Sequence, residues 1–235
     1  MGIQAKRLHL GCGPTVIDGW LNIDGSWSAW FARHQRIARL LGSLRLVPKR
    51  LVTNFYPGSI VMHDLRKPLT FVPDGTCEAV YASHVLEHML FPDAQQVLRE
   101  SFRVLEPGGV ARFVVPDLRA IVREYLGEGT VADAHGEIPD LQGADRFSAR
   151  FLNASTARQD GSVFYRTYTA LTNFHLHKWM YDGASLARHM TAAGFVDVRQ
   201  RDLHDSEIAG IDAIEAPERV AGGNGVCVEG RKPQL

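Results

Sequence analysis

The sequence has few cysteines and no long apolar run near its beginning. Only three of its 235 residues are cysteine, and none of them forms a Cys-x-x-Cys pair. This spacing argues against a disulfide framework or a zinc knuckle, and we expect no metal site. The first ten residues, MGIQAKRLHL, are too polar for a signal sequence or a membrane-spanning helix. We therefore expect a soluble protein of a reducing compartment, the cytoplasm.

The sequence also lacks a net charge of either sign. Lys and Arg together number 26, and so do Asp and Glu. Such a balance provides no overall field that would attract nucleic acid or a membrane surface, and we expect no nucleic-acid partner. Hydrophobic residues make up 45% of the chain, which is ordinary for a globular protein. We expect one domain over residues 1–235, since this length can bury a full core.

Short apolar runs alternate with helical patterns, which is typical of β-α-β units around a mainly parallel sheet. The expected strands are residues 7–10, 20–23, 59–62, 79–82, 110–115, 195–201 and 226–229. A long irregular stretch before the last strand allows it to return antiparallel. The predicted fold is α/β, a Rossmann-like doubly wound and mostly parallel seven-stranded sheet with an antiparallel C-terminal strand and helical lid insertions.

Two amphipathic helices are expected between the later strands. The segment DAQQVLRESFRVLEPGG repeats apolar residues at helical spacing, and Pro107, Gly108 and Gly109 are expected to end it. The segment SLARHMTAAGF has the same design, with Ser185 at its start and Gly194 at its close.

Two segments exceed the minimal α/β pattern and are expected to be insertions. Residues 25–58 hold a basic, tryptophan-rich helix, and residues 127–180 hold a Gly-rich loop followed by ADRFSARFLNA. In open α/β sheets, segments near the strand ends commonly shape the ligand site. Both are candidate substrate lids.

The stretch RLHLGCGPTVIDGWLNID, residues 7–24, predicts a cofactor site. A strand that ends in Gly-x-Gly, here Gly11 and Gly13, can turn sharply and bring bare backbone close to a ligand. The carboxylate of Asp24 ends the next strand and can accept hydrogen bonds from a ribose diol. A tight turn followed by a surface aspartate is the structural alternative.

A dinucleotide is a poor match for this stretch. The dinucleotide fingerprint needs a third glycine where Val16 stands. It also places its acidic residue about 20 residues beyond the glycines, whereas Asp24 lies closer to Gly11. A nicotinamide oxidoreductase is therefore a weak rival. The short link from Gly11 to Trp20 also predicts that the first crossover helix is a single turn or missing.

Five segments together resemble the class I S-adenosylmethionine-dependent methyltransferases. In chain order they are LHLGCGP, WLNID, MHDL, AVYASHVLEHM and VLRESFRVLEPGGVARFVVPD. The later segment HKWMYDGASLARHMTAAGF looks like the last helix-and-strand unit of that family, and its HKWMYD start resembles methyltransferases of surface-polysaccharide assembly. The tetrapeptide ASHV stands where amino-methylating DNA enzymes carry an NPPY-like motif.

The resemblance implies S-adenosyl-L-methionine as cofactor, S-adenosyl-L-homocysteine as product, and a set of binding residues. Gly11 and Gly13 would pack under the methionine and ribose, Asp24 would bind the ribose hydroxyls, and Asp64 with the Leu65 amide would bind adenine. The full expected set is Gly11, Cys12, Gly13, Asp24, His63, Asp64, Leu65, Ser83 and His84. Cys12 is expected to be an apolar filler rather than a reactive thiol.

Transfer to a neutral hydroxyl benefits from a general base, usually His. His84 and His177 are the catalytic candidates, and each has a structural alternative, as pocket lining for His84 and as a lid clamp for His177. His88 is expected to satisfy a buried backbone carbonyl. Glu87 is expected to begin a helix, where a carboxylate meets the positive end of the dipole.

The helix within residues 27–50 has no acidic residue. Its arginines 33, 36 and 39 are expected opposite one apolar stripe of Trp27, Trp30, Phe31, Ile37, Ala38 and Leu41. Three roles are open: a lid over the acceptor pocket, an interfacial helix that gives peripheral contact with an anionic membrane, or a dimer contact. The oligomeric state is left open.

The functional expectation is O-methylation of a sugar, glycan or other small-molecule hydroxyl. The alternative is a partner protein that binds the cofactor without methylating and presents its basic helix to an assembly. The sugar acceptor rests on resemblance rather than on site geometry.

Overall fold

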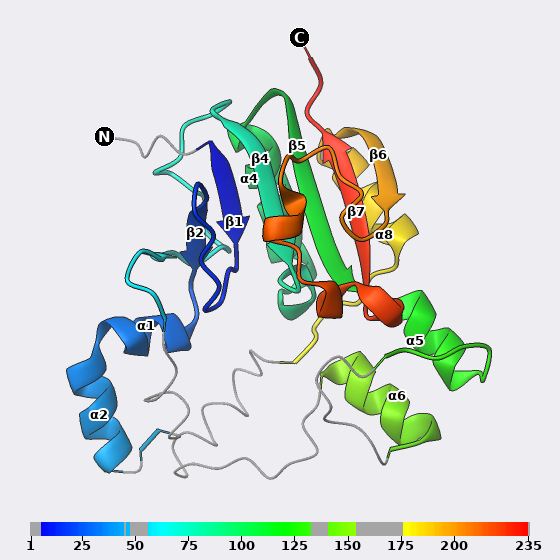
Figure 1. Ribbon diagram of the computed structural model, residues 1–235, viewed down its shortest axis with the longest axis horizontal. Coiled ribbons are helices and arrows are strands. Elements are labelled where there is room, and N and C mark those ends of the chain that lie inside the picture. Colours follow the sequence, from blue (N-terminus) through cyan, green and yellow to red (C-terminus); the bar gives the residue numbers. More distant parts are fainter. Residues whose placement is uncertain (1–5, 45, 48–55, 133–140, 154–175, 235) are drawn as a thin grey trace.

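A computed structural model describes residues 6–44, 46–47, 56–132, 141–153 and 176–234 of the chain. Its centre is one seven-stranded sheet in the order β3-β2-β1-β4-β5-β7-β6 (Figure 1). The strands are β1 (Arg7–Leu10), β2 (Leu21–Asp24), β3 (Val61–Met62), β4 (Cys77–Ser83), β5 (Leu105–Pro116), β6 (Val196–Arg201) and β7 (Gly225–Arg231).

The first five strands pair in parallel, while β7 runs antiparallel to both β5 and β6. This confirms the predicted fold class, a Rossmann-like and mostly parallel seven-stranded sheet, and the antiparallel last strand. All seven predicted strands are present; residues 7–10 have the predicted bounds, and the other six strands differ from theirs by one to five residues at an end. Between β1 and β2 the described chain forms turns and no helix, which confirms the shortened first crossover.

Helices α4 (Phe91–Val104) and α8 (Gly183–Ala192) cover one face of the sheet, behind β4, β5 and β7 in Figure 1. The predicted end of α4 was wrong, because the helix stops at Val104 and β5 already includes Pro107, Gly108 and Gly109. Leu105 already pairs with Cys77 of β4, so the backbone is extended from this residue on and the helix cannot continue.

The predicted start of α8 at Ser185 was also wrong. Asp182 caps the helix by accepting from the Ser185 amide, and the Ser185 hydroxyl accepts from the Asp182 amide in return. This reciprocal pair satisfies two backbone donors that the first helical turn leaves free. Gly194 ends the helix with a φ of +108°, as expected.

The opposite face of the sheet is covered by an irregular stretch rather than by a long helix. It contains the short 3-10 turns η2 (Ile211–Ala213), η3 (Pro217–Arg219) and η4 (Ala221–Gly223); in Figure 1 the first lies in front of the sheet and the other two lie at its lower edge, near the start of β7. The apolar side chains that pack together on this face are Trp20, Ala79, Tyr81, Val110, Val114, Ile208, Ile211, Ile214 and Cys227.

A fully buried arginine ties this stretch to the sheet. Arg112 of β5 donates from Nε and Nη2 to the two carboxylate oxygens of Glu215, at 2.8 Å each. It also donates to the backbone carbonyls of Asp202 and Asp205. A buried charge needs such complete pairing to offset its lost hydration. Arg112 thus fixes the irregular stretch over the β5 face.

The two insertions lie at the carboxyl-terminal edge of the parallel strands (Figure 1). The first contributes α1 (Trp27–Arg33) and α2 (Gln35–Ser43), and the second contributes α6 (Gly143–Leu152), which packs beside α5 (Leu118–Tyr125). Parts of both, residues 48–55, 133–140 and 154–175, lie outside the described residues. None of the described helices combines the length and apolar content that crossing a bilayer needs.

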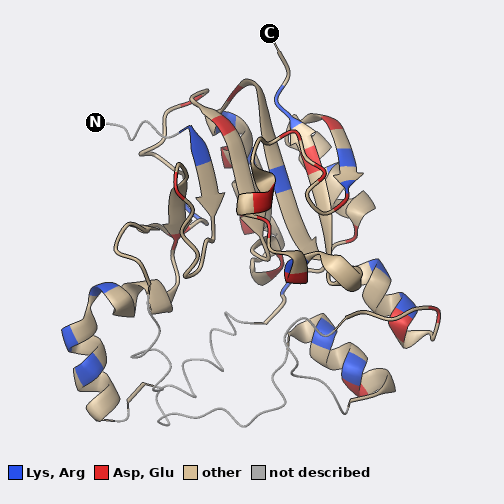
Figure 2. Cartoon of the chain, in the orientation of Figure 1, with Lys and Arg blue, Asp and Glu red and all other residues tan. Residues whose placement is uncertain are grey.

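The prediction of one continuous helix in the first insertion was wrong. The chain breaks at His34, whose backbone leaves the helical region, and α1 and α2 follow separately. The expected single apolar stripe is divided accordingly: Phe31 and Ala38 are buried, whereas Trp27 and Ile37 are exposed. Both helices carry basic and no acidic residues (Figure 2).

Candidate functional site

The turn after β1 has the geometry of a ligand cradle. Gly11 and Gly13 both adopt left-handed backbone, with φ of +63° and +58°. A Cβ on Gly11 would come within 2.4 Å of a Val85 methyl, so only glycine fits there. A Cβ on Gly13 would meet nothing within 4 Å. Gly13 therefore presents bare backbone to open space.

Asp24 ends β2 beside this turn and is almost fully buried. Its Oδ2 accepts from the Gly13 amide at 2.8 Å, and its Oδ1 accepts from the Ser26 amide at 2.7 Å. The two bonds hold the carboxylate against the cradle and leave each oxygen a further lone pair. The sequence assigned Gly13 and Asp24 to one cofactor site, and in the structure the two residues are hydrogen-bonded to each other.

The residues expected to bind adenine follow β3. His63 is anchored through its amide to the Asp24 carbonyl, and Leu65 is buried in the core. Arg66 donates two hydrogen bonds to the Asp64 carboxylate at 2.8 Å, and these hold the pKa of Asp64 below its ordinary value. An adenine amino group would share this carboxylate with Arg66.

Cys12 lies under the cradle as a buried thiol. Burial, with a smaller effect of the nearby Asp24 charge, raises its pKa to about 12. A thiol with this pKa is not a nucleophile at neutral pH. The observation agrees with the expected role of Cys12 as an apolar filler.

Ser83 and His84 stand at the carboxyl end of β4. The Ser83 hydroxyl is buried with no hydrogen-bond partner among the described residues. His84 has a φ of +54°, an uncommon conformation for a residue with a side chain. Its Nδ1 lies 3.3 Å from Oε1 of Glu87, and its Nε2 lies 3.0 Å from the Arg219 carbonyl oxygen. Both nitrogens are therefore engaged.

Glu87 is the functional candidate that the sequence reasoning missed. It lies in the 3-10 turn η1 (Leu86–His88), not at the start of α4, and its side chain is fully buried. Its Oε1 is paired with His84 Nδ1 at 3.3 Å, whereas its Oε2 has no hydrogen-bond partner within the described part of the chain. Burial would raise the pKa of Glu87, but His84 and His88 outweigh burial and lower it. The turn thus holds a buried carboxylate.

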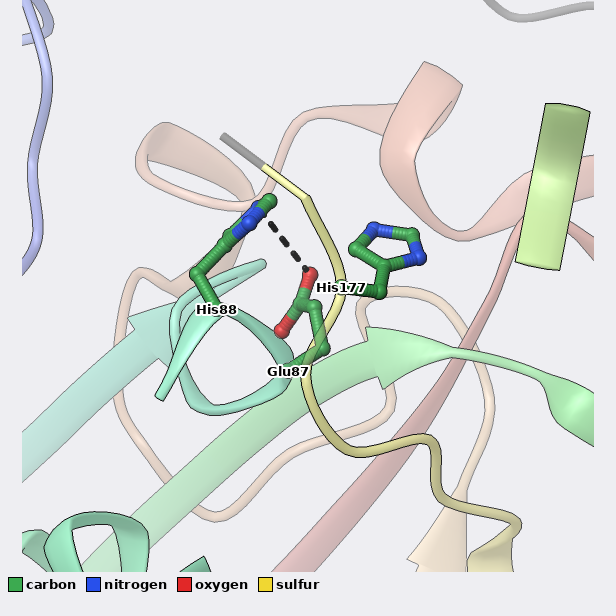
Figure 3. A group of neighbouring side chains, drawn as sticks. All are labelled: Glu87, His88 and His177. Carbon is green, nitrogen blue, oxygen red and sulfur yellow. Dashed lines mark ion pairs between the residues drawn. The ribbon is translucent and has the colours of Figure 1, made fainter. Parts of the chain in front are cut away.

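Two further histidines surround this carboxylate (Figure 3). His88 Nε2 lies 3.9 Å from Oε1 of Glu87, and the rings of His88 and His177 are 5.1 Å apart. Glu87, His88 and His177 each offer a ligand atom within 4.8 Å of the other two. The expectation that His88 meets a backbone carbonyl is confirmed, since its Nδ1 lies 3.3 Å from the Leu176 oxygen.

Backbone hydrogen bonds bring His177 to the turn from far along the chain. The Lys178 and Trp179 amides both donate to the Glu87 carbonyl oxygen. His177 itself is tied to the end of α6, because its amide donates to Leu152 and its Nδ1 lies 3.1 Å from the Phe151 carbonyl. Burial lowers the pKa of His177, so the ring is neutral near pH 7.

The cradle fits the adenosyl group of S-adenosylmethionine. Gly13 leaves open space where a side chain would stand, and Asp24 keeps lone pairs for the ribose hydroxyls at the same turn. Gly11, Gly13 and Asp24 would hold the ribose and methionine portion. Bound there, the cofactor supplies an activated methyl group and its own leaving group.

Comparisons with known proteins agree with this geometry. The family model described as "Methyltransferase domain" matches residues 24–113, which is less than half of the chain. The match begins at Asp24 and ends within β5. No curated protein matches the chain.

Several solved methyltransferase structures are similar. A SAM-dependent methyltransferase from Archaeoglobus fulgidus is 13% identical, with coverage of 96% of this chain and 85% of that one, at a TM-score of 0.47. A possible histamine N-methyltransferase from Thermotoga maritima is 18% identical, with coverage of 97% and 82%, at 0.44. The methyltransferase SibL is 16% identical at 0.44, and the match covers 97% of this chain but only 50% of SibL.

At these identities and at TM-scores below 0.5, the likenesses carry no conclusion about the activity or substrate of this chain. The topology and the match over residues 24–113 together support a methyltransferase domain in this chain, with S-adenosyl-L-methionine as cofactor and S-adenosyl-L-homocysteine as product.

Proposed function

We propose that the chain transfers the methyl group of S-adenosylmethionine to a hydroxyl of a sugar, a glycan or another small molecule. The observation that carries the proposal is the group of buried Glu87 with half-buried His88 and His177, just beyond β4 at the edge of the sheet where the Gly13 cradle also lies. A hydroxyl acceptor must lose its proton during transfer, and neutral histidine is the usual base near pH 7.

His177 is the better candidate for that base. Its Nδ1 is directed to the Phe151 carbonyl and therefore carries the ring proton, which leaves the lone pair on Nε2. His84 has both ring nitrogens engaged, with Glu87 and with Arg219. This supports His84 as a residue that positions Glu87 and lines the pocket.

The two insertions, taken as residues 25–58 and 127–180, are proposed to cover the acceptor. Their described helices lie at the carboxyl edge of the sheet, where ligands of open α/β sheets bind (Figure 1). Leu40 of α2 is exposed, and Arg36 and Arg39 add positive charge. Such a surface suits an acidic or lipid-linked glycan. Binding of the protein to anionic but not to neutral vesicles would indicate that α1 and α2 also contact a membrane surface.

The test is single-turnover transfer of a radiolabelled methyl group to a panel of monosaccharides and surface-polysaccharide fractions. Wild-type protein is expected to label at least one hydroxyl acceptor. His177→Ala is expected to lose transfer while still binding S-adenosylhomocysteine. Cofactor binding without transfer to any acceptor would favour the rival, a partner protein that no longer methylates, and would overturn the proposal.

A further inference from the structure

The group formed by Glu87, His88 and His177 has an arrangement that a base alone does not explain. Glu87 is fully buried, its Oε2 has no hydrogen-bond partner among the described residues, and its Oε1 is paired only with histidine nitrogens. A fully buried carboxylate needs hydrogen bonds or a countercharge at both oxygens to offset its lost hydration. Native structures retain such groups where a missing partner completes them.

The hydrogen bonds of the two histidines leave their lone pairs facing this carboxylate. His88 Nδ1 is directed to the Leu176 carbonyl and His177 Nδ1 to the Phe151 carbonyl, so both Nδ1 atoms donate. In the neutral form of either ring Nε2 carries the lone pair, and the Nε2 of His88 lies 3.9 Å from the Glu87 carboxylate. A cation held between the two ring nitrogens and the carboxylate would be attracted by all three groups.

A ring nitrogen that donates to a backbone carbonyl while the other faces inward is the usual arrangement of metal-binding histidines. It fixes the tautomer and the ring orientation before a metal arrives. Both histidines have it, and both carbonyls come from residues close to the site itself, Leu176 and Phe151. The ligand atoms lie within 4.8 Å of one another, and around Zn²⁺ they would draw in to about 3.3 Å.

We propose that Glu87, His88 and His177 bind one divalent first-row metal ion of the zinc class. Two imidazoles and one carboxylate give a site with an open position, as in zinc sites that bind a water or substrate oxygen. The expectation of no metal rested on cysteine spacing, which does not detect a set of histidines and one glutamate. His84, beside Glu87 but bonded to Arg219, orients the carboxylate from outside the set.

The consequence for catalysis rests on the proposed function, whereas metal binding itself does not. A bound divalent ion lowers the pKa of a coordinated hydroxyl and so removes the need for a separate base. The acceptor oxygen would then take the open position and lose its proton to solvent water, and the resulting alkoxide would attack the methyl carbon with the cofactor's sulfur as the leaving group. His177 then acts as a ligand and not as the base.

The test is a titration of the full chain, freed of metal by chelation and of any tag, with Zn²⁺ and with Co²⁺. Calorimetry is expected to give one equivalent of Zn²⁺, and Co²⁺ is expected to show visible absorption from nitrogen and oxygen ligation. His177→Gln and Glu87→Gln are expected to weaken binding by more than about 100-fold. His34→Gln, at the remote break between α1 and α2, is the matched control and is expected to bind as wild type does.

Three results would overturn the proposal: no binding by the wild-type chain, binding that both variants retain, or equal loss in the His34→Gln control. Because Glu87→Gln could alter folding, the melting temperature of each metal-free variant is measured as well. A folded Glu87→Gln protein without a zinc-induced rise in melting temperature supports the site. These readouts need neither cofactor nor acceptor, so a failed methylation assay leaves them valid.

Discussion

The Gly13 amide donates to Oδ2 of Asp24 at 2.8 Å, and this bond joins the turn after β1 to the end of β2. The other carboxylate oxygen accepts from the Ser26 amide, which starts the first insertion. One side chain therefore connects the glycine turn, the sheet edge and the first helical segment. A change in the charge or shape of Asp24 is therefore expected to disturb the positions of all three.

The two glycines of the turn should respond differently to alanine. Both have positive φ, so both substitutions bear the same type of backbone cost, about 1–2 kcal/mol. Only Gly11→Ala also brings a Cβ against Val85, and this clash is expected to add about 1–3 kcal/mol of destabilisation. Urea unfolding of both variants measures the difference. Equal stabilities would contradict the packing assigned to Gly11.

Gly13→Ala has a second expected effect. Its Cβ points into space that is empty of protein atoms, so the loss should appear in affinity for S-adenosylhomocysteine more than in stability. Calorimetry of the variant at a temperature where it is fully folded checks this. Wild-type affinity in Gly13→Ala would show that the ligand does not approach this backbone.

Stability is expected to fall with acid because of His9. His9 Nδ1 donates to Asn22 at 3.1 Å, and burial lowers its pKa from 6.5 to about 4. Below pH 6.5, His9 therefore binds a proton in the unfolded chain, whereas in the folded chain it binds one only at about pH 4. The free energy of unfolding should drop across this window, by up to about 3 kcal/mol from this group.

Urea unfolding at several pH values between 7 and 4 measures this slope. His9→Gln keeps an amide donor for Asn22 but does not titrate, so its curve should be flatter over the same range. A variant with the unchanged wild-type slope would show that other groups cause the acid sensitivity.

The buried pair of Arg112 and Glu215 should be costly to break one partner at a time. Glu215→Gln leaves the fully buried guanidinium without its main countercharge, and we expect a loss of about 3–5 kcal/mol. Thermal and urea unfolding measure the loss. Arg199→Gln removes an exposed partner of Glu207 and should cost less than about 1 kcal/mol. Comparable losses in the two variants would contradict the role given to Arg112.

The sheet was predictable because its strands are short apolar runs separated by turn residues. The absent first helix was predictable as well, since too few residues separate Gly11 from Trp20 for a full crossover. Helix ends were less predictable. Pairing of β5 with β4 overrode the Pro-Gly-Gly stop signal, and the Asp182 cap overrode Ser185. These outcomes depend on tertiary contacts that local patterns do not contain.

The residues of the candidate site were also predictable only in part. Gly11, Gly13 and Asp24 were found because one short stretch of sequence holds them all. Glu87 was assigned to a helix start because its partner His177 arrives from a distant segment, through hydrogen bonds to the Glu87 backbone. The close spacing of His84, Glu87 and His88 was the available signal, since Glu87 and His88 share the turn η1 and His84 lies just before it.

The most direct test of the account is calorimetric titration of the wild-type chain, Asp24→Asn and Asp18→Asn with S-adenosylhomocysteine. Asp24→Asn turns an acceptor into a donor that faces a backbone amide or a ribose hydroxyl, so we expect affinity to fall by about 10–100-fold, the equivalent of one or two lost hydrogen bonds. Asp18 is exposed in the same turn region, and Asp18→Asn should bind as wild type does. A wild-type chain that binds no S-adenosylhomocysteine, or an Asp24→Asn variant that binds it equally well, would contradict the cofactor site.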